Sequence, residues 1–179
     1  FRVANGGLPG RAIVATQYSN LGLVQALRTI GCQVIMANAG DKYVLGEMRR
    51  RGLVLGGEQS GHIIMLEKTT TGDGLITAIE VASVVAATGR PLSELASVMV
   101  KFPQIMVNVR VSRKDEYGAS AVIRSAVEDA QAELGDAARL VVRPSGTEPV
   151  VRVMGEGPDQ AVVRKVVEGV AGVIRAELA

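Results

Sequence analysis

The sequence predicts an α/β domain built in three layers around a mixed sheet, followed by a small α+β domain. Short apolar runs alternate with helix-like segments as far as residue 100, in the order typical of an α/β fold. A Phe-Pro-Gln run at 102–104 interrupts that order. After it, Val107 and Val109 alternate with polar residues, which indicates a strand with one exposed face. We therefore expect two domains, at 1–102 and 103–179.

The elements expected in the first domain alternate between strands and helices. The expected strands are 11–16, 32–37, 53–55 and 63–66, and the expected helices are 21–30, 42–51, 74–88 and 92–100. A Ser-Asn pair at 19–20, Asp41 and Asp73 precede three of the helices, and such side chains accept hydrogen bonds from a first helical turn. Residues 1–9 are glycine-rich without periodicity, and we expect them to form a loose lead-in.

The second domain is expected to pair an antiparallel sheet with two helices on one of its faces. The expected strands are 105–112, 140–143 and 150–154, and the expected helices are 119–134 and a final one from the cap at Asp159 to about 178. The final helix places Val162, Val166 and Val170 on one face, which we expect to be buried. Strands and helices in this order favour an α+β layer.

Composition and charge weigh against several functional classes. The 20 basic and 18 acidic residues leave a net charge of +2, which is too balanced for the strongly basic face of a nucleic-acid binder. No apolar run approaches the roughly 20 residues of a membrane-spanning helix. Cys32 is the single cysteine, so no internal disulfide can form, and the cytoplasm is the expected location.

The heptapeptide Arg-Pro-Ser-Gly-Thr-Glu-Pro at 143–149 combines the ingredients of an anion pocket. Its arginine can grip an oxyanion with two parallel hydrogen bonds, and its serine and threonine add hydroxyl donors. Glycine lets backbone N–H groups approach a ligand closely. An ordinary hairpin turn with a solvated arginine is the alternative, but the hydroxyls and a second arginine nearby favour a site for phosphate, sulfate or carboxylate. The residues of this expected anion pocket are Arg143, Ser145, Gly146, Thr147 and Arg152.

A second polar loop, Gly-Gly-Glu-Gln-Ser-Gly-His, occupies residues 56–62. Glu58, Ser60 and His62 stand at alternate positions, so in an extended loop they would share one side. A carboxylate beside a hydroxyl suits a sugar diol, since it accepts hydrogen bonds that sugar hydroxyls donate. The alternative is a mobile loop that merely joins two strands. Lys42 is either a solvated helix residue or a cation that faces the binding cleft.

The acidic side chains of the first domain do not form a recognisable metal site. Asp41, Glu58 and Asp73 are expected on separate loops, and no ligand cluster at a known spacing occurs. His62 is the only histidine, and a lone histidine is more often structural than catalytic. We therefore expect no metal on this chain.

Together these motifs resemble those of the α-D-phosphohexomutases, over nearly the whole chain from about Arg11 onward. The motifs that carry the resemblance are GGEQSGH at 56–62, TTGDGL at 70–75 and RPSGTEP with its trailing Arg152. SNLGL at 19–23 and GDKYVLGEM at 40–48 narrow it to the members that interconvert glucosamine 6-phosphate and glucosamine 1-phosphate.

The resemblance implies an active site that is divided between two halves of a longer protein. Family members have four domains, and this chain resembles the third and fourth. Their first half carries the phosphoserine that transfers the phosphoryl group and an aspartate-rich loop that binds Mg²⁺, and neither motif occurs here. The resemblance therefore implies a phosphosugar and the protein's own N-terminal domains as partners. It also implies a chain that is inactive alone.

By position, the resemblance assigns Glu58 and Ser60 to sugar hydroxyls and the anion pocket to the phosphate that is not being transferred. Lys42, Gln59 and His62 are further candidates. Two alternatives stay open. One is a mannose or glucose phosphate as substrate, against which Gln59 counts because mannose-type relatives tend to carry methionine there. The other is a non-catalytic module that binds sugar phosphates.

Overall fold

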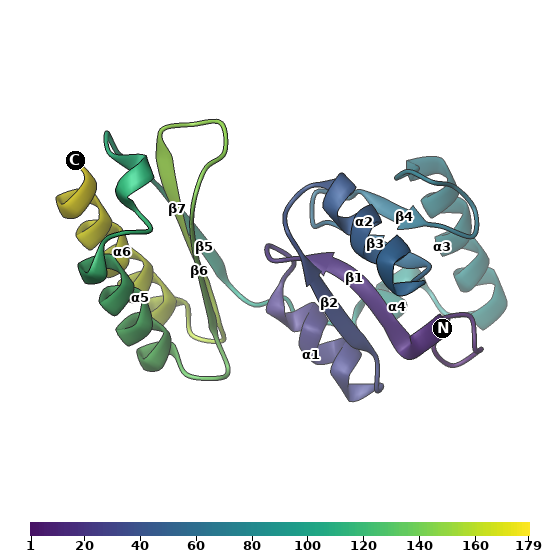
Figure 1. The fold of residues 1–179 in the computed structure, drawn as a ribbon. Coiled ribbons are helices and arrows are strands. Elements are labelled where there is room, and N and C mark those ends of the chain that lie inside the picture. Colours follow the sequence, from purple (N-terminus) through teal and green to yellow (C-terminus); the bar gives the residue numbers. More distant parts are fainter. The chain divides into compact units, whose positions relative to one another are not determined.

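The computed structural model describes residues 1–179, which form two compact units, Phe1–Lys101 and Phe102–Ala179 (Figure 1). The first unit contains η1 (Pro9–Arg11), β1 (Ala12–Thr16), α1 (Leu21–Thr29), β2 (Gln33–Ala37), α2 (Asp41–Arg51), β3 (Leu55–Gly57), β4 (Ile63–Met65), α3 (Gly74–Thr88) and α4 (Leu92–Ala96). The second contains β5 (Gln104–Arg110), η2 (Lys114–Glu116), α5 (Ala121–Leu134), β6 (Arg139–Pro144), β7 (Val150–Glu156) and α6 (Gln160–Leu178). The predicted fold class is confirmed.

The first unit is organised around a mixed sheet with the strand order β2-β1-β3-β4. Strand β1 pairs in parallel with β2 and with β3, whereas β3 and β4 form an antiparallel hairpin. The two faces of β3 are covered by different helices. A Cβ on Gly56 would lie 2.8 Å from Val44 Cγ1 of α2, so this position faces α2 directly. The adjacent Leu55 points the other way, as alternation along a strand requires, toward a groove that α3 and α4 also line.

Side-chain capping explains where two of the four α-helices of the first unit begin, α1 and α3. The Asn20 side chain accepts a hydrogen bond from Gly22 N at 3.0 Å, and the Asp73 side chain accepts one from Ile76 N at 2.9 Å. The prediction for Asp41 is wrong, because this residue is the first inside α2 and Gly40 holds the cap position.

Three other boundaries or segments differ from expectation. Strand β3 covers Leu55–Gly57 and not residues 53–55, and it ends later than expected because its pairing with β4 continues through the two glycines of the loop. Helix α4 ends at Ala96, four residues early. The lead-in is anchored and not loose, since Arg2 forms ion pairs with Glu67 at 2.6 Å and with Glu80 at 3.3 Å.

The second unit packs two helices against one face of a three-stranded antiparallel sheet with the order β5-β7-β6 (Figure 1). Helix α6 covers β5 and β7, and α5 covers β6. Val151 and Val153 of β7 belong to the core beneath these helices, so Arg152 between them lies on the opposite face. The buried stripe of α6 runs through Val163, and the expected core residue Val162 is instead 38% exposed.

Candidate functional site

The expected anion pocket forms the turn between β6 and β7. The Ser145 N–H donates to Val150 O at 2.9 Å, which closes the hairpin. The side chain of Ser145 is turned inward, with the residue only 5% exposed, and its hydroxyl accepts a hydrogen bond from Glu148 N at 3.3 Å. Ser145 therefore shapes the loop. Its neighbours Gly146 and Thr147 are exposed, and their N–H groups donate to no other part of the protein.

The sheet register places Arg143 of β6 directly opposite Arg152 of β7. Like charges at facing positions of a sheet destabilise it unless something compensates for their repulsion. The Arg152 guanidinium forms an ion pair with Glu148, with Nη2 and Oε2 2.6 Å apart. Its Nε is buried and has no hydrogen-bond partner. The hairpin thus gathers two permanent cations beside two N–H groups that are free to bind an anion, an arrangement that fits a phosphate.

The loop at 56–62 forms a tight turn, so the condition under which Glu58, Ser60 and His62 would share one side is not met. The Glu58 N–H donates to His62 O at 2.9 Å, and the Gly61 N–H donates to Glu58 O at 3.1 Å. A turn closed in this way does not place alternate side chains on one side. Gln59 and Ser60 are exposed at its tip. The His62 ring packs against the backbone of Gly72 and leaves no room there for a Cβ.

The Glu58 carboxylate connects this loop to the start of α2. Its Oε1 accepts a hydrogen bond from Gly40 N at 2.8 Å, whereas its Oε2 accepts none within the protein. Gly40 has a φ of 124°, a conformation that favours glycine. Lys42 is exposed in the first turn of the same helix, with its Nζ 4.8 Å from the centroid of the Tyr43 ring. One carboxylate oxygen is therefore held in place and the other is available to a ligand.

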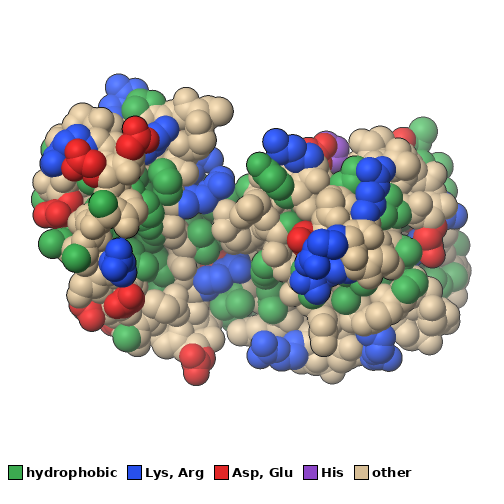
Figure 2. Space-filling view, viewed as in Figure 1, with side chains coloured by type: hydrophobic (Ala, Val, Ile, Leu, Met, Phe, Trp, Pro, Cys, Tyr) green, Lys and Arg blue, Asp and Glu red, His purple; other side chains and the backbone are tan.

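Several predicted site residues thus come together within each unit. In the first, the turn at 56–62 lies beside the start of α2 through the contact of Glu58 with Gly40. In the second, the hairpin brings the arginines of the anion pocket together with the exposed amides. Side chains of both charge signs occur on the visible face of each unit (Figure 2).

Neither a metal site nor a membrane span is found. No group of three or more His, Cys, Asp or Glu side chains is arranged to hold a metal ion, so the residues of this chain do not fit the Mg²⁺ that the resemblance implies for the longer protein. No helix combines the length and the apolar character needed to cross a membrane.

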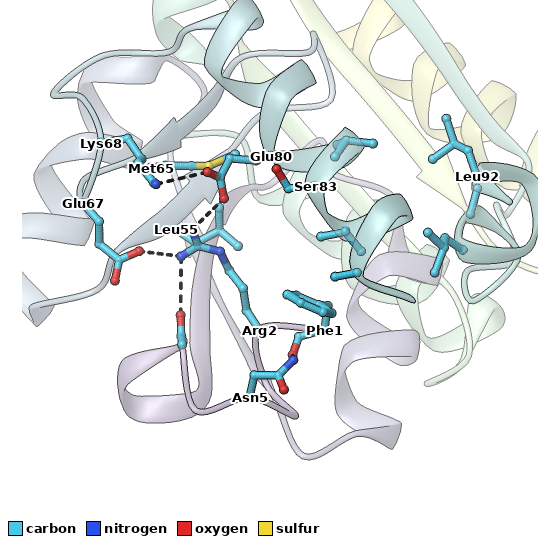
Figure 3. A pocket seen from close by; sticks show the side chains of 16 residues that line it. Phe1, Arg2, Asn5, Leu55, Met65, Glu67, Lys68, Glu80, Ser83 and Leu92 are labelled. Atoms are coloured by element: carbon cyan, nitrogen blue, oxygen red, sulfur yellow. Dashed lines mark hydrogen bonds and ion pairs between the residues drawn. The ribbon is translucent and has the colours of Figure 1, made fainter. Parts of the chain in front are cut away.

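Sequence reasoning missed an apolar groove of about 690 Å³ in the first unit (Figure 3). Leu55 and Met65 of the sheet line one side, and helices α3 and α4 line the other. Arg2 reaches across one end to Glu80, which also pairs with Lys68 at 3.2 Å. The available signal in the sequence was the apolar composition of α3 nearly all round the helix, and in the structure no residue of α3 is fully buried.

Comparisons with known proteins match nearly the whole chain in two blocks. Residues 2–102 match "Phosphoglucomutase/phosphomannomutase, alpha/beta/alpha domain III", and residues 106–173 match "Phosphoglucomutase/phosphomannomutase, C-terminal domain". The chain is 54% identical to phosphoglucosamine mutase of Moorella thermoacetica over 94% of its own length and 38% of that protein. It is 53% identical to phosphoglucosamine mutase of Rubrobacter xylanophilus, over 96% of the chain and 39% of that protein.

Solved structures share the fold at lower sequence identity. N-acetylphosphoglucosamine mutase of Aspergillus fumigatus, in complex with GlcNAc-6P and magnesium, superposes with a TM-score of 0.78 at 19% identity. The match covers 99% of this chain and 41% of that one. Another structure of the Aspergillus enzyme gives a TM-score of 0.82 at 19% identity, over 98% of this chain and 40% of that one. The chain therefore spans about two fifths of the length of the curated relatives and solved structures that it matches.

Proposed function

Because the chain belongs to the phosphoglucomutase/phosphomannomutase family, as its motifs predicted, we propose that it forms the substrate-recognising half of a phosphoglucosamine mutase. The whole protein would interconvert glucosamine 6-phosphate and glucosamine 1-phosphate. High identity to two phosphoglucosamine mutases over nearly the entire chain supports this choice of substrate within the family.

The observation that carries the proposal is the facing pair of Arg143 and Arg152 beside the free N–H groups of Gly146 and Thr147. A phosphate dianion would relieve the repulsion between the guanidiniums and accept hydrogen bonds from both amides. Each such charge-assisted bond is worth about 1.5–3 kcal/mol. Binding energy from a phosphate remote from the reacting one orients the sugar for transfer.

Glu58 is proposed to recognise the sugar with the carboxylate oxygen that the protein leaves unused. The Gly40 N–H fixes Oε1, so Oε2 keeps a defined direction and can accept a hydrogen bond from a sugar hydroxyl. The exposed Ser60 and Gln59 at the tip of the turn would contact the same ligand. Lys42 and His62 are weaker candidates, because Lys42 lies over Tyr43 and His62 packs against Gly72.

In this proposal the chain binds and orients the substrate, and the phosphoryl group is transferred by the N-terminal half of the protein. The anion pocket would hold whichever phosphate is not reacting, so the sugar must turn round between two half-reactions. Mg²⁺ would be held by that other half. No acid/base role is assigned to a residue of this chain.

The remaining domains of the same protein are the proposed macromolecular partner. The relatives are more than twice as long as this chain. Phe1 and Arg2 line the apolar groove together with apolar side chains of α3 and α4 such as Val84 and Leu95.

The test is an assay of both forms of the protein with glucosamine 6-phosphate and mannose 6-phosphate. The full-length protein should convert the glucosamine ester faster, and the 179-residue chain should convert neither. Turnover by the chain alone would overturn the divided site. A preference of the full-length protein for mannose 6-phosphate would overturn the substrate assignment.

A further inference from the structure

The segment between β5 and α5 holds the β6–β7 loop from behind. Val111 N donates to Pro149 O at 3.1 Å, and the Tyr117 hydroxyl donates to Val142 O at 3.2 Å. Between these two, the ammonium of Lys114 donates to Ser145 O at 3.0 Å and to Glu148 O at 3.2 Å. One lysine thus bridges both ends of the turn that contains Gly146.

The bridge by Lys114 determines which way the loop presents its amides. In a trans peptide the C=O and the following N–H point in opposite directions, and the chain has no cis peptide bond. Since the Ser145 carbonyl points toward Lys114, the Gly146 N–H must point away from it, toward the exposed side of the loop. Without the ammonium, the Ser145 carbonyl would be free to turn outward, where its partial negative charge would repel an anion.

We propose that Lys114 is a positioning residue of the anion pocket, which keeps the amides of the loop turned toward the phosphate. The inference rests on the proposed function of this loop and adds a residue outside the motif. Lys114 does not touch the ligand in this arrangement. It acts through the Ser145–Gly146 peptide, while its charge adds to the favourable potential behind the loop.

The experiment is a titration of the ¹⁵N-labelled chain with inorganic phosphate, followed through the amide resonances of Gly146 and Thr147. Lys114→Met should weaken phosphate binding at least tenfold and shift the Gly146 resonance before any phosphate is added. Lys165→Met is the matched control, because it removes the same charge from an exposed lysine on α6 that pairs with Glu133. The control should change the affinity less than twofold.

Two conservative variants keep the test decisive if Lys114→Met does not fold. Lys114→Arg retains the charge and can donate to both carbonyls, and it should bind phosphate within about threefold of the parent, as expected for one or two retained donors. Lys114→Gln retains a donor without the charge and should fall between the parent and Lys114→Met.

The possible failures are distinguishable. If the parent chain shows no shifts at Gly146 and Thr147, the loop does not bind phosphate and the proposed function of the site fails. If the parent binds phosphate and the Lys114 variants bind it equally well, the pocket stands and the positioning role of Lys114 is overturned.

Discussion

Arg152 and Glu148, four residues apart in sequence, form an ion pair in which Nη2 lies 2.6 Å from Oε2. The pair lies at the mouth of the anion pocket, with the Glu148 side chain 56% exposed. An incoming phosphate would need the same face of the Arg152 guanidinium. The Glu148 carboxylate would therefore compete with phosphate for the Arg152 guanidinium. The free energy of this competition is that of an exposed ion pair.

Glu148→Gln should accordingly tighten the binding of inorganic phosphate by about 1.4- to fivefold, since exposed pairs are worth about 0.2–1 kcal/mol. Isothermal titration of the chain measures this directly. Glu116→Gln is a suitable control, because Glu116 is 57% exposed and pairs with Arg113 in the same unit. Weaker binding by Glu148→Gln would mean that Glu148 holds Arg152 in its binding conformation instead of competing for it.

Removal of either pocket arginine should weaken phosphate binding by roughly 10- to 150-fold, the equivalent of about 1.5–3 kcal/mol. Arg143→Lys should recover only part of the loss of Arg143→Ala, because an ammonium cannot make two parallel hydrogen bonds to one phosphate. Arg164→Ala, an exposed substitution on α6, should have no effect. Equal binding by Arg143→Ala and the parent would place the phosphate elsewhere.

The backbone of Gly40, which bonds to Glu58 at the start of α2, leads to a prediction that compares two glycine substitutions, Gly40→Ala and Gly46→Ala. Gly40→Ala would force a side chain into a φ of 124°, at a cost of about 1–3 kcal/mol, with its Cβ 3.2 Å from the Tyr43 ring. Gly46→Ala in the same helix meets open space and should stabilise the chain by about 0.5–1 kcal/mol. The midpoint temperature of thermal unfolding should therefore fall in Gly40→Ala and rise in Gly46→Ala.

In the full-length protein, the same two variants distinguish an effect on sugar binding by the loop at 56–62 from an effect on stability alone. Gly40→Ala keeps the N–H but strains the backbone that orients it, so it should displace Glu58 and raise KM for glucosamine 6-phosphate, as Glu58→Gln should, while Gly46→Ala leaves KM unchanged. Gln59→Met should affect KM less than Glu58→Gln. An unchanged KM in Gly40→Ala, together with the expected loss of stability, would show that sugar recognition does not depend on the backbone conformation at residue 40.

The charged cluster at the end of the apolar groove should make the stability of the first unit depend on acid pH. A hydrogen bond from Lys68, with a further one from Arg2, lowers the pKa of Glu80 from its ordinary value of 4.5 against the opposing effect of desolvation. A lowered folded-state pKa contributes stability that is complete above the unfolded pKa and is lost as the pH falls through the folded value. Unfolding midpoints should thus decline below about pH 4.5.

Glu80→Gln should reduce that decline, whereas Glu94→Gln, in an exposed pair with Arg90, should not. Urea unfolding at a series of pH values between 3 and 7 provides the measurement. If Glu80→Gln leaves the slope of stability against pH unchanged, the cluster contributes nothing to acid sensitivity.

The sequence predicted those features that depend on neighbouring residues. Asn20 and Asp73 cap their helices through N–H groups two and three residues away, so local pattern sufficed. The proximity of Arg143 and Arg152 was likewise predicted, because the hairpin that aligns them is itself local in sequence. The spacing of apolar residues also predicted the helices and strands that form the layers of both units, because this spacing is local in sequence.

Expectations failed where the deciding contact spans a long stretch of chain. The partners that anchor Arg2 are 65 and 78 residues away. The carboxylate that bonds to Gly40 comes from 18 residues further on, and Lys114 reaches carbonyls 31 and 34 residues away. No local pattern encodes such pairs. The boundary between β3 and the loop at 56–62 was misplaced for a different reason, because the hairpin pairing with β4 continues through Gly56 and Gly57.

The most direct test of the anion pocket is a crystal structure of the chain soaked with glucosamine 6-phosphate. The phosphate is expected within hydrogen-bond distance of Arg143 and Arg152 and of the N–H groups of Gly146 and Thr147, with Glu148 displaced from Arg152. Phosphate density at another site, with this loop empty and the Arg152–Glu148 pair intact, would contradict the assignment.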